Sequence, residues 1–187
     1  MLYFVRHGAT DWNDFVDESG KKAPKCQGRA DIPLNENGIK QAHQIGQQLK
    51  NIKFDAIFCS PLKRAKQTLT LMFGNKNVKF KIDERLIERD FGEFEGLTRN
   101  QFDFDGFWNS KSNQNYNKAE SIADVQRRVF SFLDELSKMP NKNILIVSHG
   151  GVGFVFKTYF EGVPADGNYL KNEIPHGKPM IFSFNKQ

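Results

Sequence analysis

The chain has 187 residues, of which 39% are hydrophobic, and carries a net charge of +5. That length is sufficient for a proper core, and a single domain over residues 1–187 is the simplest expectation. No apolar run approaches the roughly 20 residues of a membrane span, and the N-terminus lacks a signal-like apolar stretch. We therefore expect a cytoplasmic protein without a membrane partner, and the two cysteines, Cys26 and Cys59, agree with a reducing compartment.

The positive charge is spread along the chain rather than concentrated on one predicted helix face. No RNA-binding aromatic motif, zinc-binding pattern or basic arm accompanies it. Scattered lysines of this kind are typical of a solvated surface, and a basic chain can also attract a small anionic substrate. The sequence thus predicts no nucleic-acid partner, and it leaves the oligomeric state open.

Strand-like and helical patterns alternate along the chain. Apolar runs predict strands at 2–6, 55–59, 78–83, 144–148 and 180–184. Over residues 37–50 the spacing of Ile39, Ala42, Ile45 and Leu49 predicts one buried helical face. Such alternation favours an α/β fold, a three-layer sandwich with a mostly parallel central sheet flanked by helices on both faces.

Two further helices have recognisable start signals. Ser60 followed by Pro61 predicts an N-cap and first helical residue, with an inward face made by Leu62, Ala65, Leu69 and Met72. Ser121 with Asp124 resembles a capping box, and it opens the clearest amphipathic helix of the chain. The predicted inward residues of that helix are Ile122, Val125, Val129, Phe132, Leu133 and Leu136.

Two stretches interrupt this regular pattern. Residues 14–26 are polar and loop-like, and residues 103–118 begin with aromatic residues and continue as an Asn/Ser/Lys-rich segment. Both could be solvated insertions, or they could form the rim of a pocket, since loops commonly carry specificity. We expect the rim or lid role mainly for 103–118.

Two buried strands end in the same pair of residues. The run at 2–6 is followed by His7-Gly8, and the run at 144–148 by His149-Gly150. The carboxyl ends of parallel strands meet at one sheet edge, where ligands bind. We therefore expect His7 and His149 to lie side by side near Arg6, an arrangement suited to binding an anion, in which one imidazole could be a nucleophile.

The segment Arg6-His7-Gly8, with Thr10 and Asn13 after it, resembles the signature of the histidine phosphatase superfamily, the phosphoglycerate-mutase-like proteins. Four later blocks resemble that family in the same order. They are Gln27-Gly28-Arg29-Ala30-Asp31-Ile32-Pro33-Leu34, Ser60-Pro61-Leu62-Lys63-Arg64-Ala65, Leu86-Ile87-Glu88 with the Phe91–Gly96 stretch, and Val147-Ser148-His149-Gly150-Gly151. Because five ordered blocks span residues 1 to about 160, the resemblance covers most of the chain.

The resemblance implies a role for each matching residue. His7 would attack phosphorus and carry the phosphoryl group, while Arg6, Arg64 and His149 would bind its oxygens. Glu88 would be the general acid, although the residues alone leave Glu84, Glu93 and Glu95 open. Asn13, Gln27 and Gly28 would donate further hydrogen bonds to the phosphoryl group or to the rest of the substrate.

The remaining histidines and arginines receive less specific interpretations. We expect structural roles for His43 and His176, surface or rim positions for Arg29, Arg85 and Arg89, and solvent-facing positions for Arg127 and Arg128. Of the rim arginines, Arg89 is the best placed to contact substrate. Two histidines and a carboxylate could bind zinc, but the neighbouring arginines would repel a cation, so we expect no metal and no cofactor.

Three functions are compatible with these residues. The spacing between Glu88 and His149 is short for a glycolytic mutase, and Phe91–Thr98 resembles the phosphatase branch. The sequence therefore predicts a phosphomonoester hydrolase that acts through phosphohistidine on a small phosphorylated metabolite. A phosphoglycerate mutase-type transfer is the alternative, and a non-catalytic phospho-ligand binding module is a third hypothesis.

Overall fold

The computed structural model describes residues 1–74, 76–112, 116, 118–139 and 142–184. Its central sheet contains five strands in the order β3-β2-β4-β1-β5. The strands are β1 (Leu2–Arg6), β2 (Ala56–Cys59), β3 (Lys81–Ile82), β4 (Ile144–Ser148) and β5 (Met180–Phe182). Only β5 runs antiparallel to its neighbour, which confirms the predicted mostly parallel sheet.

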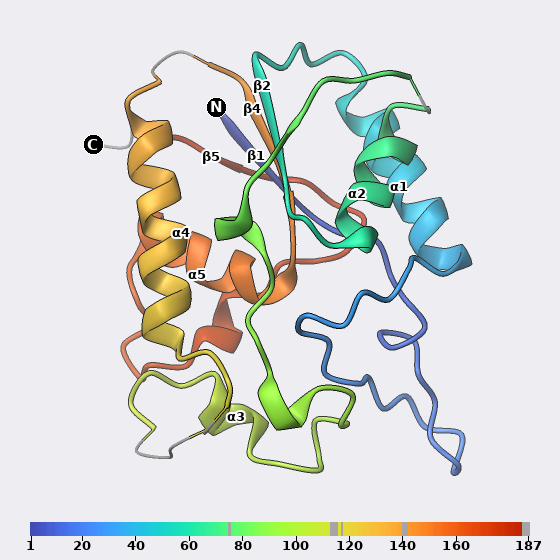
Figure 1. The fold of residues 1–187 in the computed structure, drawn as a ribbon, viewed down its shortest axis with the longest axis vertical. Coiled ribbons are helices and arrows are strands. Elements are labelled where there is room, and N and C mark those ends of the chain that lie inside the picture. Colours follow the sequence, from blue (N-terminus) through green and yellow to red (C-terminus); the bar gives the residue numbers. More distant parts are fainter. Residues whose placement is uncertain (75, 113–115, 117, 140–141, 185–187) are drawn as a thin grey trace.

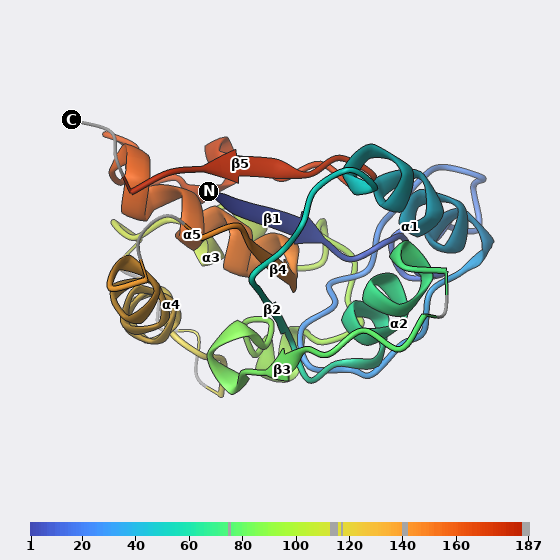
Figure 2. The ribbon, with the colours of Figure 1, turned by 90° about the horizontal axis from the view of Figure 1, so that it is seen from above.

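Helices cover both faces of this sheet, as Figures 1 and 2 show. One side carries α1 (Glu36–Leu49) and α2 (Lys63–Met72), and the other carries α4 (Ile122–Ser137) and α5 (Gly150–Glu161). A short helix, α3 (Phe104–Phe107), and 3-10 turns at Glu84–Leu86, Gly92–Phe94 and Tyr169–Asn172 complete the regular elements. The predicted α/β sandwich is confirmed. None of the described helices is long and apolar enough to cross a membrane.

Alternation along β1 divides the core into two layers. Leu2 and Phe4 pack toward α4 and α5, whereas Tyr3 and Val5 pack toward α1 and α2. All five residues of β4 are buried. A strand that is covered on both faces needs apolar residues at every position, which explains the uninterrupted runs at 2–6 and 144–148.

The helix predictions are confirmed in position but differ in detail. The Ser121 side chain caps α4 by accepting from the Asp124 N–H, and all six predicted inward residues are buried. The predicted inward position of Ile39 in α1 is wrong, since this residue is 39% exposed. The buried face of α1 contains Gly38 instead, and the absence of a side chain at Gly38 allows close contact with the Ala9 backbone. Helix α2 begins at Lys63 with Leu62 as its N-cap, so the predicted capping role of Ser60 is wrong.

Two arginines predicted near the surface prove to be internal braces. Arg128 Nη1 donates to the carbonyls of Arg85 and Ile87 at 2.7 and 2.6 Å, and it thereby ties α4 to the segment that precedes Glu88. Arg89 is only 2% exposed, and its guanidinium donates to Glu120 O and Phe107 O. Arg127, in contrast, faces solvent as expected, with its side chain 75% exposed.

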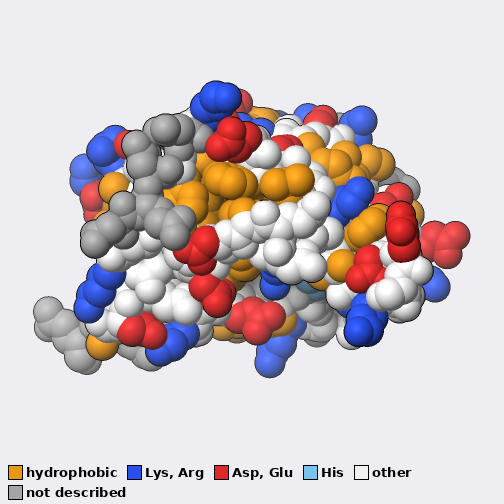
Figure 3. Space-filling view, turned by 90° about the horizontal axis from the view of Figure 1, so that it is seen from below, with side chains coloured by type: hydrophobic (Ala, Val, Ile, Leu, Met, Phe, Trp, Pro, Cys, Tyr) orange, Lys and Arg blue, Asp and Glu red, His pale blue; other side chains and the backbone are white. Residues whose placement is uncertain are grey.

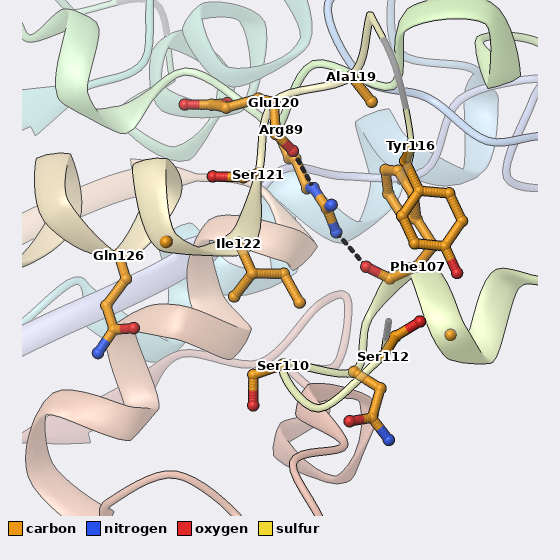
Figure 4. A pocket seen from close by; sticks show the side chains of 13 residues that line it. Arg89, Phe107, Ser110, Ser112, Tyr116, Ala119, Glu120, Ser121, Ile122 and Gln126 are labelled. Atoms are coloured by element: carbon orange, nitrogen blue, oxygen red, sulfur yellow. Dashed lines mark hydrogen bonds between the residues drawn. The ribbon is translucent and has the colours of Figure 1, made fainter. Parts of the chain in front are cut away.

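Arg89 holds the 103–112 segment against the core (Figure 4). Its guanidinium lies 3.5 Å from the Phe107 ring centroid and borders a pocket of about 320 Å³. Phe107 and Trp108 are fully buried, so the start of the predicted rim segment is core rather than surface. Part of that segment, residues 113–115 and 117, lies outside the described residues.

We expect Arg89→Met to destabilise the fold by about 2–4 kcal/mol. The substitution leaves the carbonyls of Glu120 and Phe107 without their donor and removes a cation–π contact. Chemical denaturation would measure the change in unfolding free energy. Arg127→Met is the matched control, and it should stay within about 0.5 kcal/mol, as surface substitutions usually do. Equal effects of the two substitutions would contradict the bracing role of Arg89.

Candidate active site

The parallel register of β1 and β4 brings the two strand-end histidines together. Arg6 pairs with Ser148, and the His7 N–H donates to Ser148 O at 2.9 Å. The rings of His7 and His149 are therefore 5.2 Å apart between centroids, and both residues are buried. This adjacency was predicted from the strand ends alone.

The tautomer of His7 follows from its hydrogen bond. Its Nδ1 lies 2.6 Å from the Gly8 carbonyl, and only a protonated nitrogen can donate to a carbonyl. Burial first, and then the charge of Arg64, hold the pKa of His7 well below its usual range, so the ring is neutral. A neutral ring that is protonated at Nδ1 carries its lone pair on Nε2, which makes Nε2 the nucleophilic atom.

His149 is oriented by a residue that sequence reasoning assigned to a helix cap. Ser60 Oγ lies 2.6 Å from His149 Nε2, while the buried Nδ1 has no partner among the described residues. If the serine hydroxyl donates, Nδ1 carries the proton and can donate to a ligand. Burial and then Arg64 lower the pKa of His149 well below its usual value, so it is neutral in the free enzyme.

Two arginines supply the positive charge. Arg64, on the first turn of α2, donates through its Nη atoms to Gly28 O and Ala30 O, each at 2.7 Å. Arg6 Nη1 donates to Ile174 O at 3.0 Å, and the Nε of each arginine is buried without a partner in the described chain. Burial lowers the pKa of both side chains to about 10, which leaves them cationic at pH 7.

Glu88 is the most deeply buried of the four candidate carboxylates. It is 5% exposed, and its oxygens accept N–H bonds from Arg89, Gly151 and Val152, at the start of α5. Burial raises the pKa of Glu88, and these backbone donors oppose the rise. Among the alternatives, Glu84 and Glu93 are exposed, and Glu95 accepts the N–H groups of Gly28, Arg29 and Ala30.

The predicted phosphate-binding residues divide into two groups. Asn13 and Gln27 line a pocket of about 60 Å³ together with Arg6, His7 and Glu88, and Gln27 Nε2 is a buried donor without a partner in the described residues. Gly28 does not line that pocket. Its N–H bonds to Glu95 and its carbonyl accepts from Arg64, so it positions the arginine instead.

Two residues near the site were missed as site residues. His176 Nδ1 donates to His7 O at 2.8 Å, and its ring centroid is 5.6 Å from that of His7. Trp108 lines the pocket with its buried indole Nε1 lacking a partner among the described residues. His43 is exposed, as expected of a residue outside the site. Because β5 runs antiparallel to β1, the residues that precede β5 lie beside the C-terminal end of β1, near His7. The position of His176 shortly before the strand predicted at 180–184 was the one indication in the sequence that it lies near the site.

The unpartnered buried atoms have a common chemistry. In the described part of the chain they are Arg6 Nε, Gln27 Nε2, Arg64 Nε, Trp108 Nε1 and His149 Nδ1. All can act as donors, and buried donors without partners are costly unless a ligand accepts from them. The set suits an oxyanion. No group of three or more His, Cys, Asp or Glu side chains in the described ranges is arranged to hold a metal.

Comparisons with known proteins point to one family. The family model of the histidine phosphatase superfamily (branch 1) matches residues 2–184. An uncharacterized phosphatase, PhoE of Bacillus subtilis, is 33% identical over 84% of this chain and 76% of its own length. A phosphoglycerate mutase of Schizosaccharomyces pombe is 28% identical over 100% of this chain and 90% of its own.

Among solved structures, a putative α-ribazole-5'-P phosphatase from Escherichia coli superposes with a TM-score of 0.74. The two sequences are 28% identical, and the match covers 95% of this chain and 87% of the other. The family match covers nearly all residues, and the two strand-end histidines, two arginines and a buried glutamate lie at one sheet edge. The chain therefore belongs to the histidine phosphatase superfamily.

Proposed function

We propose that this protein is a cofactor-independent phosphomonoester hydrolase that acts through a phosphohistidine intermediate on a small phosphorylated metabolite. The observation that carries the proposal is the bond between His7 Nδ1 and Gly8 O, which leaves Nε2 free for attack. The nearby unpartnered donors of Arg6, Arg64 and His149 support it, because they can bind the charged oxygens of a phosphoryl group.

The reaction has two displacement steps. In the first, His7 Nε2 forms a bond to phosphorus, the ester P–O bond breaks, and the departing oxygen takes the proton of Glu88. In the second, Glu88 accepts a proton from water as the water oxygen attacks phosphorus and the P–N bond to His7 breaks. Arg6, Arg64 and His149 bind the non-bridging oxygens throughout.

The distribution of arginines favours hydrolysis over phosphoryl relay. Glu88 and His149 are 61 positions apart (149 − 88), and three arginines beyond Arg89 lie between them. Arg127 faces solvent and Arg128 braces backbone carbonyls, so only Arg99 of the three lines the pocket. Few side chains therefore remain to hold a phosphoglycerate while its phosphoryl group moves.

We expect the enzyme to transfer the phosphoryl group to water. With 3-phosphoglycerate, a bisphosphoglycerate primer and excess EDTA, it should release inorganic phosphate faster than it forms 2-phosphoglycerate. Phosphate release and isomer ratio can be followed in the same reaction. Faster isomerisation would establish the mutase alternative, and a rate that is restored only by a divalent ion would contradict metal independence.

On the face of the molecule seen in Figure 3, basic and acidic side chains are interspersed around hydrophobic ones. The described residues visible on that face form no continuous basic stripe of the kind that follows a nucleic-acid backbone. This mixed charge is consistent with the proposal of a small substrate bound in a pocket.

A further inference from the structure

A second, larger pocket lies next to the catalytic pocket. Its volume is about 320 Å³, compared with about 60 Å³ for the pocket that contains His7, and no described residue lines both. Consecutive residues form the wall between them, because Glu88 and Trp108 border the catalytic pocket while Arg89 and Phe107 border the second one. The second pocket is therefore a separate site that the proposed hydrolysis does not use.

The guanidinium of Arg89 forms part of the wall of this second pocket (Figure 4). Its Nε donates to Glu120 O at 2.8 Å, and its Nη1 donates to Phe107 O at 2.5 Å. Nη2 has no acceptor in the described part of the chain, yet it is not one of the fully buried atoms without a partner. Since Arg89 is only 2% exposed, the accessible surface that remains on Nη2 faces the pocket.

Arg89 takes part in no ion pair among the described residues. Burial lowers the pKa of Arg89 to about 10, an effect that the nearby Glu120 and Glu88 only partly oppose, so the side chain is cationic at pH 7. Glu120 also lines the pocket, but its two carboxylate oxygens accept from Arg128 at 2.7 and 3.0 Å. Figure 4 shows this carboxylate pointing away from the Arg89 guanidinium, which is thus a buried cation without a counterion.

The first turn of α4 borders the same pocket. Ile122 and Ala123 both line it, and their N–H groups have no acceptor in the described residues, since the first N–H groups of an α-helix have no partner within the helix. The N-terminus of this 16-residue helix carries a partial positive charge. Arg89 and α4 therefore supply two independent sources of positive potential to one pocket.

We propose that this pocket is a second, non-catalytic binding site for a small organic anion, held through its phosphate or carboxylate group by Arg89 and the first turn of α4. The anion would supply the counterion that Arg89 lacks, and free N–H groups at a helix N-terminus favour the same charge. A volume of about 320 Å³ exceeds what a bare oxyanion needs, and it lies within the usual range for small-molecule sites. Ser110 and Gln126 also line the pocket, and they suit a ligand with a polar body.

The test follows backbone amide signals of the full-length protein by NMR during titration with sodium phosphate or sodium acetate, at ionic strength held constant with chloride. The Ile122 signal should shift in a saturable manner, with a Kd of about 1–10 mM, because each probe is only a fragment of the ligand. The amide of Gln27, which lines the catalytic pocket, reports on anion binding there in the same spectra. The two sites are thus measured separately.

Two variants remove the proposed site by different means. Arg89→Met deletes the cation and should raise the Kd measured at Ile122 at least about tenfold. Ala123→Glu leaves Arg89 and its bracing hydrogen bonds in place, and it adds a carboxylate at an exposed position in the wall, which should repel the anion and also raise the Kd. Ala123→Gln is the matched neutral control and should keep the Kd of the unmodified protein.

Each outcome bears on the proposal. A raised Kd in Arg89→Met and Ala123→Glu, with Ala123→Gln unchanged, supports the site, and the anion that binds more tightly identifies the charged group of the ligand. If Arg89→Met fails to give the dispersed spectrum of a folded protein, the two Ala123 variants decide alone. The proposal is overturned if neither anion causes a saturable shift at Ile122, or if Ala123→Glu retains the Kd. It is also overturned if Ile122 and Gln27 shift with one common Kd that these substitutions leave unchanged.

Discussion

His7→Ala is expected to abolish turnover, with a loss of at least ~10⁴-fold in kcat, because removal of a nucleophile is among the most damaging changes to an active site. The lone pair on Nε2 of this neutral, Nδ1-protonated ring is suited to the attack on phosphorus that we propose. Of the other described histidines, His149 Nε2 lies 2.6 Å from Ser60 Oγ. The His176 Nδ1 also donates to a backbone carbonyl, but His176 does not line the pocket that contains His7 and Glu88.

The intermediate provides a direct measurement. Rapid quench of a reaction with labelled ester should trap a phosphoryl group on His7 that survives base and is lost in acid, and His7→Ala should carry no label. His43→Ala, at an exposed position on α1, is the matched control and should retain both label and rate. Label on a serine, cysteine or aspartate would overturn the mechanism.

Glu88→Gln is expected to slow hydrolysis of alkyl phosphates by about 10²–10⁴-fold, the usual contribution of a positioned general acid. An alkoxide needs a proton as it leaves, whereas p-nitrophenolate is stable without one. Phosphorylation of His7 by p-nitrophenyl phosphate should therefore suffer far less. If Glu88 also activates water in the second step, phosphohistidine should accumulate with this ester.

Single-turnover phosphorylation rates with both esters measure this difference. Equal losses on the two esters would mean that Glu88 binds phosphate or supports structure instead. Glu93→Gln is the control, because Glu93 is exposed and its loss should leave both rates intact. Since a glutamine amide can accept fewer N–H bonds than the Glu88 carboxylate does, unfolding curves should accompany the kinetics to confirm that the variant is folded.

The pH profile supplies a second readout for Glu88. Burial raises the pKa of this carboxyl, so its protonated form persists to higher pH than that of an exposed glutamate. For an alkyl phosphate, the rate of the first step should fall as the pH rises through that pKa, because the acid loses its proton. Glu88→Gln should lack this descending limb, and an unchanged profile would assign it to another group.

The sequence predicted most reliably those elements whose environment is uniform. The runs at 2–6 and 144–148 are apolar throughout because both faces are covered, and their bounds match β1 and β4. The edge strands were overextended, since 78–83 shortens to Lys81–Ile82 and 180–184 to Met180–Phe182. An edge strand ends where its partner's hydrogen bonds end, and the strand's own residues do not encode that limit.

For the candidate site, the residues at strand ends could be predicted and those that depend on packing could not. The positions of His7 and His149 could be predicted from the apolar runs that precede them. The parallel register of β1 with β4 then brings the two side chains together. The partner of Ser60, the inward position of Arg89 and the indole of Trp108 depend on contacts between distant segments. Neither the hydrophobic periodicity of the sequence nor its helix-capping signals can predict such contacts.

The way Arg64 is held has a thermodynamic consequence for ligand binding. The Glu95 carboxylate accepts hydrogen bonds from the N–H groups of residues 28–30. The carbonyls of Gly28 and Ala30 in turn accept hydrogen bonds from the guanidinium of Arg64 and hold it in place. An arginine that is free to rotate would lose conformational entropy when it grips a phosphoryl group, and that loss would weaken binding. In this protein the hydrogen bonds of the folded chain fix the rotamer of Arg64. The guanidinium is therefore preorganised, and its side-chain entropy is lost on folding rather than on substrate binding.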